Sequence, residues 1–227
     1  MMVSTARVLL LTTILVASAA DAQWRIDLSG GALVMPWAVD LQHAEILNDP
    51  AINVRDFSTT ARFETGGTYA VGARYAITEH LELGGQFEQS LSRDADRLPN
   101  SRGSVTRNAA LDIFSVTFGT RIHLLSSDHR FRPWLIAEGG WYRANAQIDE
   151  VAVPVAGECF PHCPFGFPGF HHSGGPDDGF GFNVGTGFDF ALTPWLSIGP
   201  DVRYQHAVNV LGNLDFVTTS ATVGFHF

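Results

Sequence analysis

The sequence predicts an all-β protein, an eight-stranded antiparallel up-and-down transmembrane β-barrel. Apolar and polar residues alternate over segments of about ten residues, which is the period of a strand with one apolar face. Eight such segments follow one another, joined by connections that are alternately short and long, as in barrels that cross a membrane. Beyond residue 22, no apolar run approaches the roughly 20 residues of a transmembrane helix.

Residues 1–22 have the order of a secretory signal peptide. Arg7 precedes an apolar stretch at 8–17, and small residues ending in Ala20-Asp21-Ala22 follow. A membrane anchor, the alternative, needs about 20 apolar residues and no cleavage motif. We therefore expect export, with cleavage before Gln23.

The composition limits the partners of the remaining domain, residues 23–227. The chain has a net charge of −9 and contains no lysine. Binding to nucleic acid depends on clustered Lys and Arg that neutralise phosphates. The composition therefore argues against a nucleic-acid partner.

The first two strands are expected at 24–34 and near 63–77. The first carries Trp, Ile, Leu, Ala and Val on one face, and the second alternates Tyr, Val, Ala and Ile with Gly and Arg. A long polar stretch at about 35–60 separates them and is expected to be a surface loop. A tight turn at 78–80 follows the second strand.

The third and fourth strands are expected at 81–91 and 114–124. Leu and Phe alternate with Glu, Gln and Ser in the third, and Phe, Val, Ile and Leu alternate with polar residues in the fourth. Residues 93–108 are rich in charge and in Asn, Ser and Pro, which indicates a solvated loop. A short polar turn at 126–129 ends this pair.

The fifth and sixth strands are expected at about 131–146 and 180–190. The fifth has the least regular alternation, which is consistent with a β-bulge. The sixth has the clearest, with Phe and Val alternating with Gly, Asn and Asp. Residues 148–178 between them have no sustained period and are expected to form the longest loop.

The last two strands are expected at 196–205 and 220–227. A short turn at 193–194 precedes the seventh strand, in which Leu, Ile, Val and Tyr alternate with Ser, Asp, Arg and Gln. A modest loop at 207–215 leads to the terminal strand, which alternates to the last residue.

The charged residues of these strands lie opposite the apolar face. An arginine in the middle of a lipid-facing wall costs about 2–4 kcal/mol, so we expect the apolar face to meet lipid and the charges to line the lumen. A soluble barrel that holds an apolar ligand would have the reverse arrangement. The predicted lumen charge network consists of Arg74, Glu82, Glu88, Arg121, Glu138, Asp189, Asp201 and Arg203.

Two interpretations of this network remain open. Eight strands enclose about as much space as side chains fill, and an unpaired interior charge is costly. The network is therefore expected to pair across the lumen and plug it. The alternative is a gate that breaks transiently to pass water or ions.

The segment around Cys159 and Cys163 contains the only two cysteines of the chain. In an exported protein, cysteines separated by three residues are expected to form a disulfide. The alternative is a zinc or copper site. Its candidate ligands are Cys159, His162, Cys163, His171 and His172. The same segment displays Phe160, Phe165, Phe167 and Phe170, which we expect to form a contact surface.

The chain resembles the outer-membrane β-barrel domain of the OmpA-like superfamily. The resemblance is carried by the signal peptide, the alternating strands, the turns at 77–81 and 192–196, the segment 132–135 and the closing residues 223–227. It implies a place in the bacterial outer membrane, in contact with lipid and lipopolysaccharide. It also implies that Val223, Phe225 and Phe227 form an assembly signal for the barrel-assembly machinery. No periplasmic peptidoglycan-binding domain follows Phe227, so cell-wall tethering by that route is not expected.

The resemblance does not extend to an enzyme's catalytic residues. Lipid A deacylases of similar size carry a His-x-Ser-Asn motif, and the nearest match is His206-Ala207-Val208-Asn209. Valine has no hydroxyl for nucleophilic attack. We therefore expect no catalytic residues and no cofactor, and a lipid A-modifying enzyme is a lesser alternative.

The expected function is that of a non-enzymatic barrel that supports envelope integrity. Its surface loops are expected to bind an extracellular ligand. The alternative is a transport function, as a narrow or transient channel for water, ions or a small solute.

Overall fold

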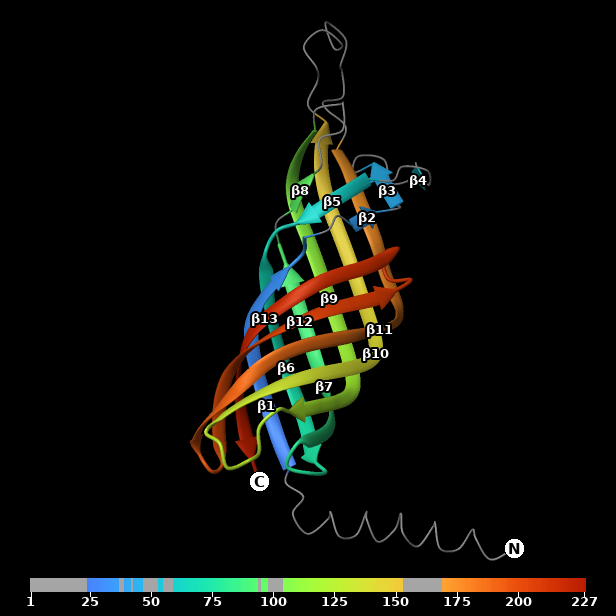
Figure 1. Cartoon of the computed structure of the whole chain (residues 1–227). Coiled ribbons are helices and arrows are strands. Elements are labelled where there is room, and N and C mark those ends of the chain that lie inside the picture. Colours follow the sequence, from blue (N-terminus) through green and yellow to red (C-terminus); the bar gives the residue numbers. More distant parts are fainter. Residues whose placement is uncertain are drawn as a thin grey trace, which may run out of the picture.

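The computed structural model describes residues 24–36, 39–41, 43–46, 53–54, 59–93, 95–97, 104–152 and 169–227, and it forms a closed β-barrel (Figure 1). The barrel strands pair antiparallel with their neighbours in chain order, and the last pairs with the first. They are β1 (Trp24–Val34), β6 (Gly66–Ala76), β7 (Leu81–Ser92), β9 (Ser104–His123), β10 (Phe131–Ala152), β11 (Gly169–Thr193), β12 (Leu196–Val208) and β13 (Asn213–His226). The predicted eight-stranded antiparallel barrel is confirmed.

The strands are staggered around the barrel. Starting at Trp24, we followed the paired residues from strand to strand around the barrel. The path returns to β1 at Val34, so the stagger is ten residues. A stagger of this size tilts the strands by about 40° from the barrel axis. The ladder is complete at the end where the termini meet, because the Phe227 amide donates to the Trp24 carbonyl at 2.8 Å. No sheet edge is therefore left open along β1 and β13 there.

The two ends of the barrel differ. One end, here called the turn end, carries the short connections at 77–80, 124–130 and 194–195. At the other, the loop end, β9, β10 and β11 extend well beyond their neighbours (Figure 1), with 20, 22 and 25 residues. No helix of the described residues is long and apolar enough to cross a membrane.

The long strands correct two loop predictions. Residues 93–108 and 148–178 were expected to be loops, yet β9 begins at Ser104, β10 continues to Ala152 and β11 begins at Gly169. Pairing between β10 and β11 continues to Val151, opposite Gly169. Pairing between these strands satisfies the hydrogen bonds of their backbones, and it does not require side chains that alternate between apolar and polar. The extensions therefore could not be predicted from periodicity. The irregular alternation of β10 coincides with a register shift between Ala144 and Ala146.

The expected loop at 35–60 also contains short strands. β2 (Val39–Leu41), β5 (Thr59–Phe63) and β8 (Ala95–Arg97) form a small sheet, while β3 (His43–Ile46) pairs with β11 and with β4 (Asn53–Val54). All five lie at the loop end (Figure 1). Because Phe63 belongs to β5, the second barrel strand starts at Gly66 rather than near residue 63.

The connection between β12 and β13 is shorter than the expected loop at 207–215. Only residues 209–212 lie between the two strands. Asn209, Leu211 and Gly212 have φ values of 61°, 48° and 91°. A bulky residue such as Leu211 rarely adopts a positive φ, so packing must hold it there, and its side chain is indeed buried.

The outward face of the barrel is an apolar belt. Its exposed side chains include Ile26, Leu28, Val71, Val116, Phe118, Leu135, Val184, Phe188, Ile198 and Val202. Towards the loop end, the first charged outward-facing residues of the described strands are Asp112, Arg143, Asp178 and Asp215. On β12, the belt from Leu196 to His206 corresponds to about 25 Å along the axis, which matches the apolar band of a membrane barrel.

Candidate functional site

The lumen holds a network of buried charges. The eight residues assigned to the lumen from the sequence all point inward and are at most 5% exposed. They alternate with the belt residues because successive side chains of a strand point to opposite faces.

Asp27 of β1 is the centre of this network. Its Oδ1 lies 2.6 Å from Nε of Arg25, and its Oδ2 lies 2.9 Å from Nη2 of Arg121 and 3.5 Å from Nε of Arg74. Arg25 and Asp27 were absent from the predicted network. Their alternation with Trp24, Ile26 and Leu28 was the signal that could have included them.

Further ion pairs spread from this centre towards the turn end. Nη2 of Arg25 donates to Oδ1 of Asp189 at 2.8 Å. Arg121 lies 3.6 Å from Glu82, whose other oxygen is 3.0 Å from Nε2 of His123. These contacts connect β1, β7, β9 and β11 across the lumen.

A second group of contacts lies on the other side of the centre. Nη2 of Arg74 donates to Glu138 at 2.6 Å, and Asn183 donates to the other oxygen of Glu138 at 3.0 Å. Arg203 pairs with Asp201 at 2.7 Å and lies 4.0 Å from Glu138. The same carboxylate of Glu138 therefore connects Arg74 of β6 with Arg203 of β12.

Glu88 lies beside this second group and is held by amide side chains. Its carboxylate accepts hydrogen bonds from Gln205 at 2.7 Å and from Gln86 at 2.9 Å. Arg203 in turn donates to Gln86. The amides thus link Glu88 indirectly to the arginine.

Inward-facing glycines provide the space for the large side chains. A Cβ added at Gly187 would lie 2.6 Å from the Trp134 ring, and one at Gly84 would lie 2.8 Å from Arg74 Cγ. Trp134 itself stacks under Arg121, with the guanidinium carbon 4.4 Å from the ring centroid. The network therefore depends on these glycines as well as on its charged members.

We predict that Gly187→Ala lowers the free energy of unfolding by about 1–3 kcal/mol, the usual cost of overpacking. The added methyl also meets the Pro200 carbonyl at 2.6 Å, which is backbone and cannot move aside easily. Gly30→Ala is the matched control, because a Cβ there meets nothing within 4 Å. Urea unfolding of both refolded variants measures the difference, and equal stabilities would contradict the packing argument.

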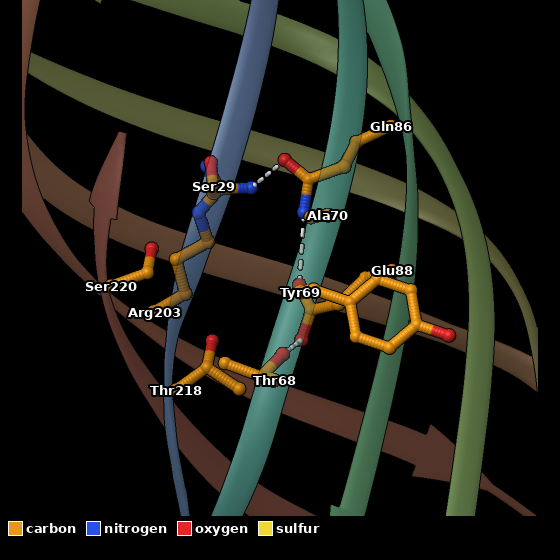
Figure 2. A pocket seen from close by; sticks show the side chains of 9 residues that line it. All are labelled: Ser29, Thr68, Tyr69, Ala70, Gln86, Glu88, Arg203, Thr218 and Ser220. Carbon is orange, nitrogen blue, oxygen red and sulfur yellow. Dashed lines mark hydrogen bonds between the residues drawn. The ribbon is translucent and has the colours of Figure 1, made fainter. Parts of the chain in front are cut away.

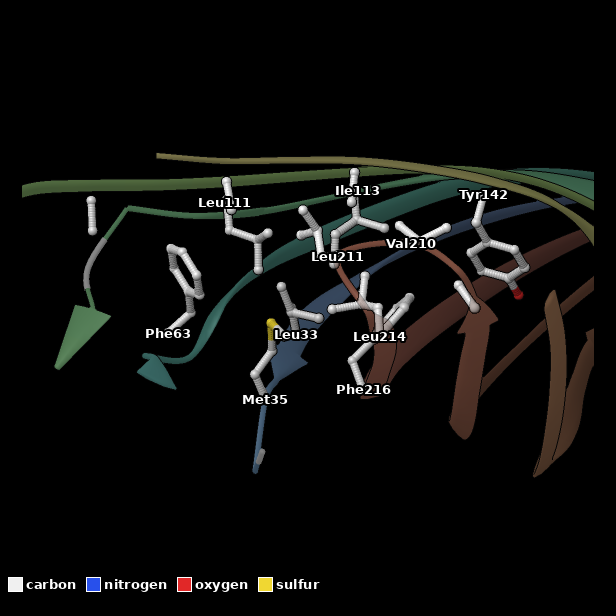
Figure 3. Close-up of a cluster of buried hydrophobic side chains, with 14 residues drawn as sticks. Leu33, Met35, Phe63, Leu111, Ile113, Tyr142, Val210, Leu211, Leu214 and Phe216 are labelled. Carbon is white, nitrogen blue, oxygen red and sulfur yellow. The ribbon is translucent and has the colours of Figure 1, made fainter. Parts of the chain in front are cut away.

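The loop end of the lumen is apolar. A buried cluster, here called the apolar mouth, fills it (Figure 3). Its members are Leu33, Met35, Phe63, Ala109, Leu111, Ile113, Tyr142, Ala144, Ala146, Ala207, Val210, Leu211, Leu214 and Phe216. Val210 and Leu211 enter it from the β12–β13 turn, so this turn covers the mouth.

The apolar mouth was not predicted from the sequence. The inward positions are apolar there, while the outward neighbours are apolar at Val34 but charged at Asp112, Arg143 and Asp215. The rule that the polar face is the inner one, which holds along the belt, therefore fails at the mouth. Tyr142 marks the boundary, since its hydroxyl donates to Gln205 Oε1 at 3.2 Å while its ring packs near Phe216.

A small cavity lies between the network and the apolar mouth. This cavity, between β1, β6, β7, β12 and β13, has a volume of ≈ 10 Å³ (Figure 2). A cavity needs about 10–15 Å³ to hold one water. Its lining includes Glu88 and Arg203, so a single water there would lie beside the charge network.

An outward-facing cluster lies near the end of the belt. His206 Nδ1 is 2.8 Å from Oδ1 of Asp215, which also accepts the Tyr204 hydroxyl. An oriented histidine is part of a catalytic triad, but a nucleophile is also needed. Val208, two residues further on the same face, supplies no hydroxyl.

Several predicted site residues lie outside the described parts of the structure. These are Cys159, Phe160, His162, Cys163, Phe165 and Phe167, together with the predicted signal peptide. Phe170, His171 and His172 belong to the backbone of β11, opposite Ile46, Glu45 and Ala44 of β3. The three residues of the predicted assembly signal, Val223, Phe225 and Phe227, share the outward face.

Solved structures resemble the whole barrel. The outer membrane protein OprG from Pseudomonas aeruginosa matches with a TM-score of 0.51 and 12% identity over 89% of this chain and 95% of its own. Neisserial surface protein A matches with a TM-score of 0.45 and 14% identity over 90% and 97%. Ail of Yersinia pestis matches with a TM-score of 0.41 and 12% identity over 89% and 98%. No protein-family model and no curated protein matches the sequence.

The closed ladder, the apolar belt and the charged interior define an outer-membrane β-barrel. The eight-stranded fold is the one that the resemblance to the OmpA-like superfamily implied, and the likeness to OprG supports it.

Proposed function

We propose that the chain is a non-enzymatic barrel of the bacterial outer membrane with a lumen that does not conduct. It supports envelope integrity and displays its loop end for binding an extracellular ligand. The observation that carries the proposal is that the lumen is filled at two levels, by the charge network and by the apolar mouth.

The two fillings oppose conduction in different ways. An ion passing the network must separate buried charge pairs, which leaves charges uncompensated in a medium that solvates them poorly. An apolar constriction excludes water and thereby ions. The cavity of ≈ 10 Å³ between the two fillings is consistent with this view, because it has room for about one water.

Planar-bilayer recording tests the proposal. The refolded mature chain is expected to give no steady single-channel conductance, whereas an open porin in the same membrane gives clear steps. Heat-modifiable migration in gels checks that the recorded protein is a folded barrel. A steady conductance that changes when Arg121 is replaced by Gln would refute the proposal and favour a channel.

The alternative, a narrow or transient channel, has one observation in its favour. Three guanidinium nitrogens of Arg121 are buried without an ideal hydrogen-bond acceptor, and Arg203 reaches towards both Asp201 and Glu138. Arginines with more than one carboxylate within reach can exchange partners. Such an exchange would open a path only if the apolar mouth also parted.

A lipid A-modifying enzyme has less support. The His206–Asp215 pair lies near the end of the belt, but the described strands place Val208 where a nucleophile would be needed.

The proposal also covers export, assembly and the surface loop. Residues 1–22 direct export and are removed, and the barrel-assembly machinery recognises Val223, Phe225 and Phe227. Cys159 and Cys163 close a disulfide that helps to display the contact surface of Phe160, Phe165, Phe167 and Phe170. Lipid and lipopolysaccharide surround the belt.

A further inference from the structure

A groove crosses the outer surface of the barrel at the loop end of the belt. It has a volume of ≈ 460 Å³ and lies over β7, β9, β10 and β11. Its position is where the apolar belt ends and the first outward charges begin, so in a membrane it would lie at the level of lipid headgroups.

The floor of the groove is aromatic. The Phe114 ring packs edge-on against Phe87, with centroids 4.8 Å apart, and against Trp141, at 5.5 Å. Trp141 and Phe114 line the groove and continue the belt below it. Aromatic residues that combine apolar area with a polar tip are typical of the membrane interface, and the Trp141 indole lies 3.4 Å from Asp178.

Polar side chains form the other part of the groove. Gln89, Asp112, Arg143 and Asn145 line it. Gln89 donates to Asp112 at 3.1 Å, which leaves the second carboxylate oxygen of Asp112 able to accept. Asn145 offers both a donor and an acceptor.

Arg143 is the distinctive residue of the groove. Within the barrel strands whose side chains are described, it is the arginine that faces outward at this level, whereas Arg25, Arg74, Arg121 and Arg203 face the lumen. It is exposed. Asp178 lies opposite it on β11 and accepts from the Trp141 indole, and none of the described carboxylates is within ion-pair distance of Arg143. With respect to the described residues, its guanidinium donors are therefore available to an external anion.

We propose that this groove binds the phosphorylated headgroup of an outer-leaflet glycolipid. Arg143 pairs with the phosphate, to which a guanidinium can donate in a bidentate manner. Asp112 and Asn145 bind sugar hydroxyls, and an acyl chain lies along Phe114 and Trp141. The site rests on the proposed outer-membrane location, but not on whether the lumen conducts.

Native mass spectrometry of the refolded mature chain in detergent tests this site. The probes are bis-phosphorylated lipid A, the same lipid without its phosphates, and inorganic phosphate as competitor. We expect lipid A to bind the native protein, and Arg143→Gln to bind it at least about tenfold more weakly, the effect of losing one charge-assisted hydrogen bond. Arg130→Gln, the same substitution in the exposed turn before β10 at the opposite end, is the matched control and should bind as the native protein does.

Each other outcome overturns the proposal. Equal binding by Arg143→Gln would remove the role of Arg143, and equal binding of the dephosphorylated lipid would remove the role of phosphate. Displacement by inorganic phosphate would assign the site to a free anion rather than to a glycolipid. Heat-modifiable migration of every variant ensures that a loss of binding is not a loss of folding, and a bilayer recording of the same samples keeps this result separate from the conductance test.

Discussion

Replacing Asp27 with alanine is expected to lower the free energy of unfolding by about 3–5 kcal/mol, the cost of removing one partner from a buried ion pair. The Asp27 carboxylate lies within 4 Å of three arginines, namely Arg25, Arg74 and Arg121. Its removal leaves their positive charges close together in the lumen with too little compensation. Urea unfolding of the barrel refolded into lipid vesicles, followed by tryptophan fluorescence, measures the loss.

The control for this prediction is Asp128→Asn in the turn between β9 and β10. Asp128 is exposed and has no ion pair among the described residues, so its replacement should change the stability by less than about 0.5 kcal/mol. Asp27→Asn retains the shape but not the charge and should fall between the two. If Asp27→Ala left the barrel as stable as the native protein, other groups or water would have to compensate the arginines.

An arginine introduced into the middle of the belt is the second large change. Val202→Arg is expected to cost about 2–4 kcal/mol, because the charge would face the hydrocarbon core. Val208→Arg, on the same strand and the same face but beyond the belt, should cost about 0–1 kcal/mol at the interface. The two valines are similarly exposed, at 47% and 43%, so the difference between the variants reports the depth in lipid.

The same unfolding assay compares the two variants. If both arginines were tolerated equally, the outward face would not meet a bilayer at the assigned depth. If Val208→Arg were the more harmful, the belt would be displaced towards the loop end.

The barrel could be predicted because its main signal, the alternation of apolar and polar residues, lies within each strand. Alternation along each strand identifies the two faces, and the cost of exposing charge to lipid decides which face is outside. The inward position of Arg74, Arg121 and Glu138 follows from these two steps alone. Which carboxylate each arginine meets depends on the stagger of ten residues around the barrel, and no single strand contains that information.

The features that were missed have a common cause. At Leu33 the inward residue is as apolar as its outward neighbour Val34, and at Leu111 the outward neighbour Asp112 is charged, so the rule of a polar inner face misassigns the filled mouth. The extensions of β10 and β11 depend on backbone pairing rather than on side-chain pattern. The groove at Arg143 forms because Phe114 of β9 and Trp141 of β10 are neighbours. Their proximity follows from the register between the two strands, which the sequence does not reveal.

The orientation of the barrel wall, with the apolar face against the bilayer and the charged face enclosed, underlies everything proposed for this protein. Spin labels at Val202 and Val223, on the belt, and at Asp128, in a turn, test it directly in the refolded barrel in lipid vesicles. We expect the two belt labels to collide with oxygen dissolved in the lipid and to be shielded from a water-soluble nickel complex. The turn label should behave in the opposite way. Belt labels that are relaxed by nickel as strongly as the turn label would contradict this orientation.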